Sequence, residues 1–209
     1  DSGDDVWPKI ASDSAGNWVV IWESDENLAG AAQTDADILV STSSDDGGSW
    51  SDPALLNSNG NTDSGADSFA SIATDGSGTW ISTWVSQETL FGMIHVPGNI
   101  FVASSTDNGS TWTPPALVNG SLQGGSTWPQ ITTDRAGNWI VVWHARFVTT
   151  SYFSSPGSDQ DVFFSSSSDS GVNWTFPSLL NANGVGDLGN DNSVNLTTGT
   201  TVSIGNKNM

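Results

Sequence analysis

Short runs of alternating apolar and polar residues recur along the chain, separated by turns rich in Gly, Asp, Asn and Ser. Successive side chains of a strand point to opposite faces, so such alternation predicts β-strands. In the segment 18–22, for example, Trp18, Val20 and Trp22 would share one face. No segment has the 3.6-residue apolar period of a helix, and no apolar run reaches the roughly 20 residues of a membrane-spanning helix. The pattern predicts an all-β protein.

Two short patterns recur three times in step. The first, S-x-D-x-G-x-x-W, is called the box turn below, and its copies begin 62 residues apart. The second precedes each box turn, beginning at Asp13, Asp75 and Asp134 and ending in a pair of Trp. Repetition at a fixed period indicates a repeat architecture. The box-turn residues are Ser43, Asp45, Gly47, Trp50, Ser105, Asp107, Gly109, Trp112, Ser167, Asp169, Gly171 and Trp174.

Each repeat is predicted to hold four strands. The first is the segment 7–11, matched by 69–73 and 128–132, and the second carries the Trp pair. The third is 37–43, matched by 99–105 and 161–167. The fourth is expected to start at Trp50 and to run through Leu55 and Leu56. The repeats span about 4–57, 66–119 and 126–181, and all six Trp of the pairs are expected in equivalent packed positions.

The box residues suit a structural role in a turn. Asp and Ser hydrogen-bond to nearby backbone groups, Gly supplies a positive φ, and Trp covers the hairpin. The alternative is that the three Asp act as acids or metal ligands. Three turns on separate repeats are not expected to converge on one ligand, which favours the structural role.

The box turns, with the preceding strand and the Trp-Pro-x-Ile strand, resemble the Asp-box (BNR) repeats of the sialidase superfamily over about residues 4–181. The resemblance implies a β-propeller of four-stranded antiparallel blades, here three repeats, or half of a six-bladed ring. Residues 182–209 would form a partial fourth repeat or a strand-exchange tail. Within them, 191–198 is similar to the first strand at 67–74.

Sialidases hold the sialic acid carboxylate with three arginines, the first in a Phe-Arg-Ile-Pro motif. Alignment of that Pro on Pro8 puts Val6 at the arginine position, and alignment on Pro129 puts Thr127 there. The whole chain contains only Arg135 and Arg146. It therefore cannot supply the triad by itself.

The loops at about 23–36, 85–98 and 144–160 are long and unlike one another, and alternating strands would place them opposite the box turns. The candidate ligand-binding residues in them are Arg146, Tyr152, Glu88, His95, His144 and Glu23. Glu88 and Tyr152 could imitate the Glu-assisted Tyr nucleophile that the resemblance implies. His95 and His144 could share a metal, although solvent-exposed histidines are the simpler expectation. The alternative for the whole set is that these residues only cover the blade edges.

Acidic residues outnumber basic ones by 23 to 4, giving a formal net charge of −19. This balance argues against nucleic acid and anionic membranes as partners. It suits solubility in a salty or extracellular setting, or else a supply of oxygen ligands for calcium as a cofactor. The chain has no Cys, which removes disulfides and thiolate chemistry. We expect a secreted or cell-surface protein.

Three function classes fit the sequence. The protein could be a non-catalytic propeller that binds glycan or protein, a fragment or degenerate relative of a sialidase-type glycosidase, or a structural module that assembles through open blade edges. The missing arginines favour the first and third classes. Three blades leave two open flanks, so we expect a homo-oligomer or part of a longer propeller.

Overall fold

The computed structural model describes residues 3–26, 28, 35–60, 65–88, 98–120, 125–146 and 160–181, and the backbone of 194–197 and 201–204. These residues form three four-stranded antiparallel sheets and no helix, which confirms the all-β prediction. None of the described segments is therefore a helix that could cross a bilayer.

The three sheets are called blades 1, 2 and 3. Blade 1 contains β1 (Asp5–Ser12), β2 (Trp18–Ser24), β3 (Asp37–Ser43) and β4 (Ala54–Leu55). Blade 2 contains β5 (Asp67–Thr74), β6 (Trp80–Ser86), β7 (Asn99–Ser105) and β8 (Ala116–Leu117). Blade 3 contains β9 (Ser126–Thr133), β10 (Trp139–Arg146), β11 (Gln160–Ser167) and β12 (Ser178–Leu179). A two-stranded sheet follows, made of β13 (Val194–Thr197) and β14 (Thr201–Ile204).

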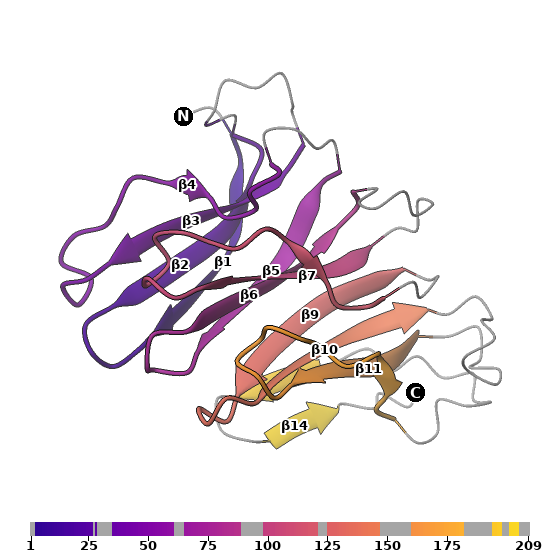
Figure 1. Cartoon of the computed structure of the whole chain (residues 1–209). Coiled ribbons are helices and arrows are strands. Elements are labelled where there is room, and N and C mark those ends of the chain that lie inside the picture. Colours follow the sequence, from indigo (N-terminus) through magenta and orange to yellow (C-terminus); the bar gives the residue numbers. More distant parts are fainter. Residues whose placement is uncertain are drawn as a thin grey trace.

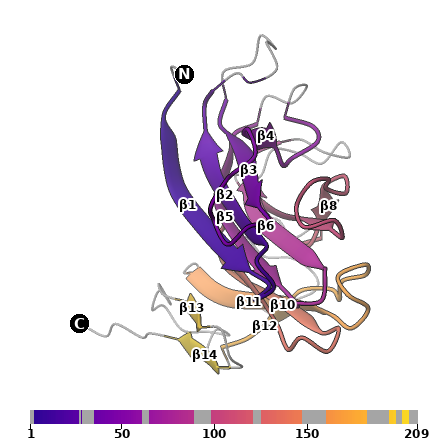
Figure 2. The ribbon, with the colours of Figure 1, turned by 90° about the vertical axis from the view of Figure 1, so that its left-hand side faces the viewer.

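The blades lie side by side in chain order (Figure 1), and their first strands β1, β5 and β9 contact one another in that order. In the turned view (Figure 2), β13 and β14 lie beyond blade 3, and β13 contacts β9 and β10. The first strands thus form the inner side of a partial propeller. Residues on β1, β5 and β9 therefore lie close to the axis of the propeller.

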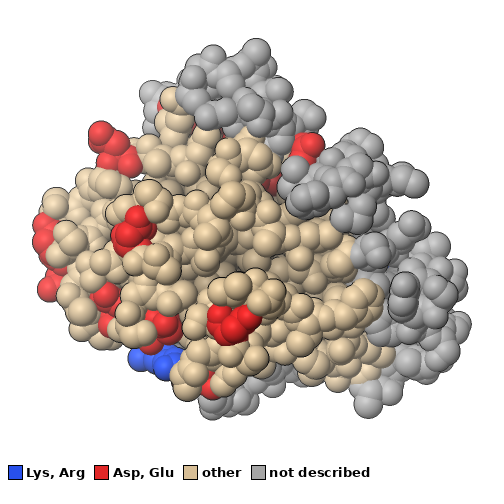
Figure 3. Space-filling view, in the orientation of Figure 1, with Lys and Arg blue, Asp and Glu red and all other residues tan. Residues whose placement is uncertain are grey.

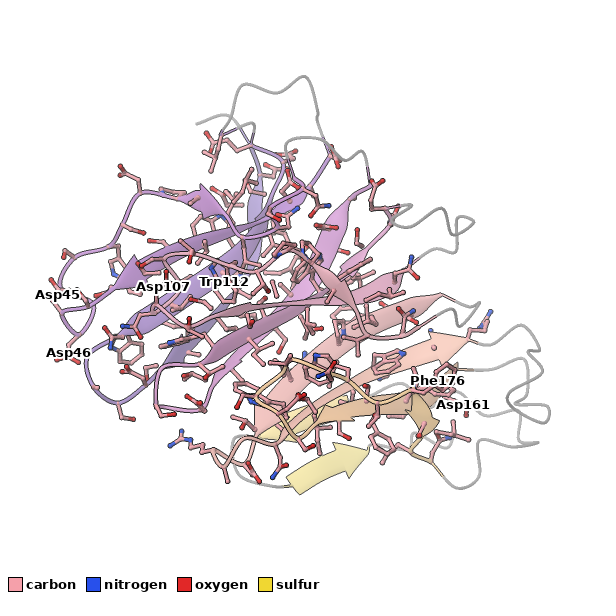
Figure 4. The ribbon with its side chains drawn as sticks, in the orientation of Figure 1. Asp45, Asp46, Asp107, Trp112, Asp161 and Phe176 are labelled. Atoms are coloured by element: carbon pink, nitrogen blue, oxygen red, sulfur yellow. The ribbon has the colours of Figure 1, made fainter. Side chains whose placement is uncertain are left out.

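The box turns and the turns before the Trp pairs lie at the same end of the blades. In blade 1 the Asp46 amide donates to the Gly16 carbonyl at 3.1 Å, and in blade 3 Ser170 donates likewise to Gly137 at 3.1 Å. Figure 4 shows Asp45 and Asp46 at this end, and Asp161 at the opposite one. We call the two ends the box end and the loop end.

Two apolar clusters hold neighbouring blades together. One combines Val19, Ile21, Ile38 and Val40 of blade 1 with the Trp face of blade 2. The other combines Ile81, Ile100 and Val102 of blade 2 with the Trp face of blade 3. In each case β-branched side chains of one blade fill the spaces between the indoles of the next. The core therefore lies between the blades.

The Trp pair is not equally buried in the three blades, which corrects the expectation of equivalent packing. Trp80, Trp84, Trp139 and Trp143 are at most 1% exposed. Trp18 and Trp22 of blade 1 are only half-buried. The β-branched faces of blades 1 and 2 cover the Trp faces of blades 2 and 3, and neither apolar cluster includes Trp18 or Trp22.

The fourth strands are shorter than the predicted ones. β4 spans only Ala54–Leu55, not a strand from Trp50. The Ser51 amide still donates to the Thr42 carbonyl at 2.9 Å, but Pro53 has no N–H for the ladder. The Leu56 amide resumes pairing with the Ile38 carbonyl at 2.8 Å. A proline thus interrupts the backbone hydrogen-bond ladder of each fourth strand.

Two of the three box-turn glycines, Gly109 and Gly171, lie against the preceding blade as well as completing a turn. Gly47, Gly109 and Gly171 have φ values of 83°, 84° and 85°. A Cβ on Gly109 would lie 3.0 Å from side-chain carbons of Val19 and Thr42 in blade 1, and one on Gly171 would collide with Ile81 of blade 2. A Cβ on Gly47 would meet only Trp50 of its own turn, at 3.8 Å. Gly47 is therefore a matched control for the inter-blade contact.

We expect alanine at these three positions to destabilise unequally. Gly47→Ala should cost about 1–2 kcal/mol, the strain of a positive φ on an L-residue. Gly109→Ala and Gly171→Ala should cost about 1–3 kcal/mol more, because the added methyl overpacks a blade interface. Urea unfolding of the three variants measures the difference. Equal losses at all three sites would show that the glycines serve only the turn.

An asparagine after each fourth strand forms hydrogen bonds at the loop end of its blade. Asn57 donates from its side-chain nitrogen to Asp37 Oδ1 and to Asp67 Oδ2, both at 2.8 Å, and accepts from the Ile38 amide at 3.2 Å. Asp37 belongs to blade 1 and Asp67 to blade 2, so one amide bridges two blades. Asn119 and Asn181 accept the equivalent backbone bond, at 3.1 Å each. This third pattern shares the 62-residue period.

Asp37 should make stability depend on pH. Burial raises its pKa to about 6, opposed by the Asn57 hydrogen bond and reinforced by Asp35. The folded chain therefore keeps a proton that the unfolded chain releases, and the free energy of unfolding should fall as pH rises from about 4 to about 6. Asp37→Asn should remove this part of the fall, while Asp45→Asn, at an exposed box turn, should leave it. Parallel unfolding curves for wild type and Asp37→Asn across this pH range would refute the assignment.

Candidate functional site

Each inner strand carries an aromatic residue in an unusual backbone conformation. Trp7, Phe69 and Trp128 occupy the same position in the three repeats and have φ values of 55°, 56° and 54°. A positive φ is uncommon for a bulky residue and costs of order 1–3 kcal/mol. The pairing shows a bulge at each position; in blade 1, for example, Val6 opposes Glu23 and Lys9 opposes Ile21. Bulges of this kind redirect a side chain out of the sheet.

The three aromatic rings meet near the propeller axis, and together they are called the aromatic cluster. Trp7 and Trp128 lie edge to face with centroids 6.3 Å apart, and Phe69 and Trp128 lie 4.3 Å apart at 32°. Trp7 and Trp128 come from blades that are not neighbours, so they can meet only where the inner strands converge. Trp7 is 55% exposed and Trp128 47% exposed, while Phe69 is partly buried. The cluster presents apolar rings to solvent.

Glu23 of blade 1 makes a hydrogen bond to the backbone of one member of this cluster. Its carboxylate accepts a hydrogen bond from the Phe69 amide at the bulge of the next blade. The side chain is 6% exposed. Burial raises its pKa, and the Phe69 amide and the positive charge of Lys9 oppose that rise. Glu23, a predicted ligand residue, therefore positions the bulge of Phe69 in the structure.

The structure corrects the predicted extent of the loops. Glu23, His144 and Arg146 lie within β2 and β10 rather than in loops. His144 is 5% exposed, so the expectation of a solvent-exposed histidine is wrong for it. It shares a strand face with Val142, which is 1% exposed. Arg146 is exposed at the end of β10, and Glu88 is half-buried just after β6.

His95 and Tyr152 lie outside the described residues, so the suggested Glu88–Tyr152 and His95–His144 pairs stay predictions. Among the residues that the structure describes, no group of three His, Asp or Glu side chains is placed to hold a metal ion. Calcium stays a prediction, since backbone and amide oxygens can also bind it.

The box aspartates are occupied by their own turns. Asp45 accepts from the Ser49 amide at 2.8 Å and the Ser49 hydroxyl at 2.7 Å, and Ser43 donates to it at 2.8 Å. These hydrogen bonds lower the pKa of Asp45 to about 2. Asp107 accepts the same bonds from Ser105 and Thr111, and Asp169 accepts them from Ser167 and Asn173, with the Asn173 side-chain amide in place of the hydroxyl. Such carboxylates are poor proton donors at neutral pH.

The two arginines cannot form part of one carboxylate clamp. Arg135 lies in the turn before β10, at the box end, and Arg146 ends β10 at the loop end. At the positions where the resemblance would place arginines, Val6 is 41% exposed and Thr127 is half-buried. The described part of the chain thus has no arginine at the sialidase positions.

A groove of about 750 Å³ follows the inner strands toward the box end, and its lining begins two residues after each member of the aromatic cluster, at Lys9, Ser71 and Gln130. It is lined on β1 by Lys9–Ser12, on β5 by Ser71–Thr74 and on β9 by Gln130–Thr133. The adjoining residues Ser14, Trp18, Asp134 and Arg135 complete it. Its volume lies within the range of small-molecule sites. Its walls combine hydroxyl and amide groups with apolar side chains, among them Ile10, Trp18 and Ile72.

Acidic side chains are spread over the face shown in Figure 3, where basic ones form a single small patch. Lys9, Arg135 and Arg146 are the basic residues in the described part of the chain, and Lys9 and Arg135 line the groove. The groove is therefore much less acidic than the surrounding surface.

Several solved structures share this fold. A Hadza microbial sialidase is 18% identical with a TM-score of 0.57, over 80% of this chain and 36% of that chain. A protein of unknown function from Dyadobacter fermentans is 15% identical with a TM-score of 0.60, and the match covers 86% of this chain and 56% of that chain. A family 117 glycoside hydrolase from Zobellia galactanivorans is 13% identical with a TM-score of 0.52, and the match covers 80% of this chain and 53% of that chain. The chain spans between about a third and somewhat over half of these proteins.

No protein-family model matches the chain, and no curated protein sequence matches it. The structural matches show a sialidase-like β-propeller fold, of which the described blades form part.

The aromatic cluster was not among the predicted site residues. A signal for it exists, because the first residue of the segments 7–11, 69–73 and 128–132 is aromatic in all three repeats. The bulge itself has no such signal. It depends on how each inner strand pairs with its neighbour.

Proposed function

We propose that this protein is a non-catalytic, extracellular carbohydrate-binding β-propeller that holds a glycan at the aromatic cluster. The observation that carries the proposal is the strained backbone of Trp7, Phe69 and Trp128, together with the solvent exposure of the Trp7 and Trp128 side chains. Strain of this kind persists at functional sites, where the surrounding structure enforces it. The flat C–H faces of sugar rings stack on such aromatic surfaces, and sugar hydroxyls need hydrogen-bonding groups like those of the adjoining groove.

A sialidase-type activity is the alternative. It would need cationic groups for the sialic acid carboxylate, and Val6 and Thr127 cannot supply them. The fold shared with a sialidase and a glycoside hydrolase agrees with a carbohydrate ligand. Binding without turnover is the function that these residues support best.

The aromatic cluster should be required for glycan binding. Trp128→Ala should weaken binding at least tenfold, about 1.4 kcal/mol, because it removes the ring that contacts both other members. Trp50→Ala is the matched control, since Trp50 is 42% exposed but belongs to a box turn. Calorimetry against xylo-, manno-, gluco- and arabino-oligosaccharides measures both variants. Equal affinity of Trp128→Ala and wild type would exclude the cluster as the site.

The chain should not act as a sialidase. The purified protein is expected to release no sialic acid from a fluorogenic sialoside, because no arginine stands at the positions of Val6 and Thr127. Turnover that disappears in a Tyr152→Phe variant would overturn the non-catalytic assignment.

We also infer that another blade covers blade 1 in the functional molecule. Ile10 is 56% exposed there, whereas its counterpart Ile131 in blade 3 is 5% exposed. The half-buried Trp18 and Trp22 lie on the same open face. A homo-oligomer or a longer propeller would supply the covering blade.

A further inference from the structure

We propose that Glu23 is the positioning residue of the aromatic cluster, and that its carboxylate sets the affinity for a glycan without contacting the ligand. This inference rests on the proposed glycan-binding function and adds the residue that controls that site. It depends on the surroundings of Glu23, on its counterparts in the other blades and on its ionisation.

Glu23 lies between the bulges of Trp7 and Phe69. Its backbone pairs with Val6, the residue directly before Trp7, and Lys9 follows on the far side of that bulge. Its carboxylate accepts the hydrogen bond from the Phe69 amide, within the bulge of β5. One residue thus contacts two strained inner strands. Because only 6% of its surface is exposed, Glu23 is not placed to bind a sugar itself.

Phe69 connects Glu23 to the rest of the cluster. Its ring lies 4.3 Å from the ring of Trp128, and Trp128 lies edge to face with Trp7. All three residues have a positive φ, which persists only where the surrounding structure enforces it. Loss of the hydrogen bond at the Phe69 amide would let this bulge relax. Trp128 would then lose the ring against which it packs.

The counterparts of Glu23 show that this role belongs to one blade. Val85 in blade 2 and His144 in blade 3 occupy the same position, since each pairs with the residue directly before the cluster member of its own blade. Val85 is buried in the apolar cluster between blades 2 and 3. A valine side chain fits this position but has no oxygen to accept a hydrogen bond. Glu23→Val therefore removes the acceptor and introduces a residue that the fold already accommodates in blade 2.

The ionisation of Glu23 links the cluster to pH. Burial raises its pKa, and the Phe69 amide and the positive charge of Lys9 on β1 oppose that rise. An ionised carboxylate is a stronger acceptor than a protonated one, so protonation weakens the bond to Phe69. Glycan affinity should therefore fall as the pH is lowered through the raised pKa of Glu23. The other acidic side chains on β1, β3 and β5, the strands packed against β2, have hydrogen-bond partners of their own; they are Asp5, Asp37 and Asp67.

Calorimetry on three variants tests this role, with the xylo-, manno-, gluco- or arabino-oligosaccharide that wild type binds in a Trp128-dependent way. At neutral pH, Glu23→Val should weaken binding about tenfold through the loss of a charge-assisted hydrogen bond. Glu23→Gln should stay within about twofold of wild type, because its amide oxygen still accepts from Phe69. Between about pH 7 and about pH 4, affinity should fall for wild type but not for Glu23→Gln. Asp37→Asn is the matched control, since it removes another buried carboxyl and should keep the wild-type pH dependence.

Amide hydrogen exchange separates this inference from the proposed function, because it needs no ligand. Exchange at the Phe69 amide should be about tenfold faster in Glu23→Val than in wild type or Glu23→Gln. Three results would each overturn the role of Glu23 while leaving glycan binding at the cluster: wild-type affinity in Glu23→Val, an equal loss in Glu23→Gln, or unchanged exchange at Phe69. If none of the sugars binds wild type, the proposed function fails, and exchange at Phe69 alone then decides whether Glu23 holds the bulge.

Discussion

Burial of one blade face against the next is the interaction on which the whole structure depends. A four-stranded blade is too thin to enclose a core, so its apolar side chains leave water only when a neighbouring blade covers them. The two apolar clusters lie at the two blade interfaces. Where the interface is missing, at blade 1, Trp18 and Trp22 stay half-buried although their counterparts are buried.

The same packing creates the conditions for a site at the axis. Because β1, β5 and β9 converge, residues from blades 1 and 3 can touch across blade 2. The bulges turn Trp7, Phe69 and Trp128 away from their sheets, and Glu23 fixes one bulge from the neighbouring blade. The packed interfaces between neighbouring blades hold these strained conformations in place.

Many of the acidic side chains of the protein form hydrogen bonds within its own fold. The box aspartates bind their turns, Asp37 and Asp67 share the Asn57 amide, and Glu23 holds a backbone N–H. Acidic residues in this protein therefore indicate turns and blade joints at least as often as a surface for ligands. The groups facing the proposed ligand are mainly aromatic and neutral polar.

The sequence by itself determined the strands, the turns and the repeat, because these follow from local periodicity and from residues within one turn of each other. It predicted the second and third strands within three residues of their observed ends. It could not predict the bulges, the burial of Glu23 and His144, or the short fourth strands. Only the tertiary structure decided these, because each depends on which residue of a neighbouring strand or blade faces the position, and that register has no signature in local sequence.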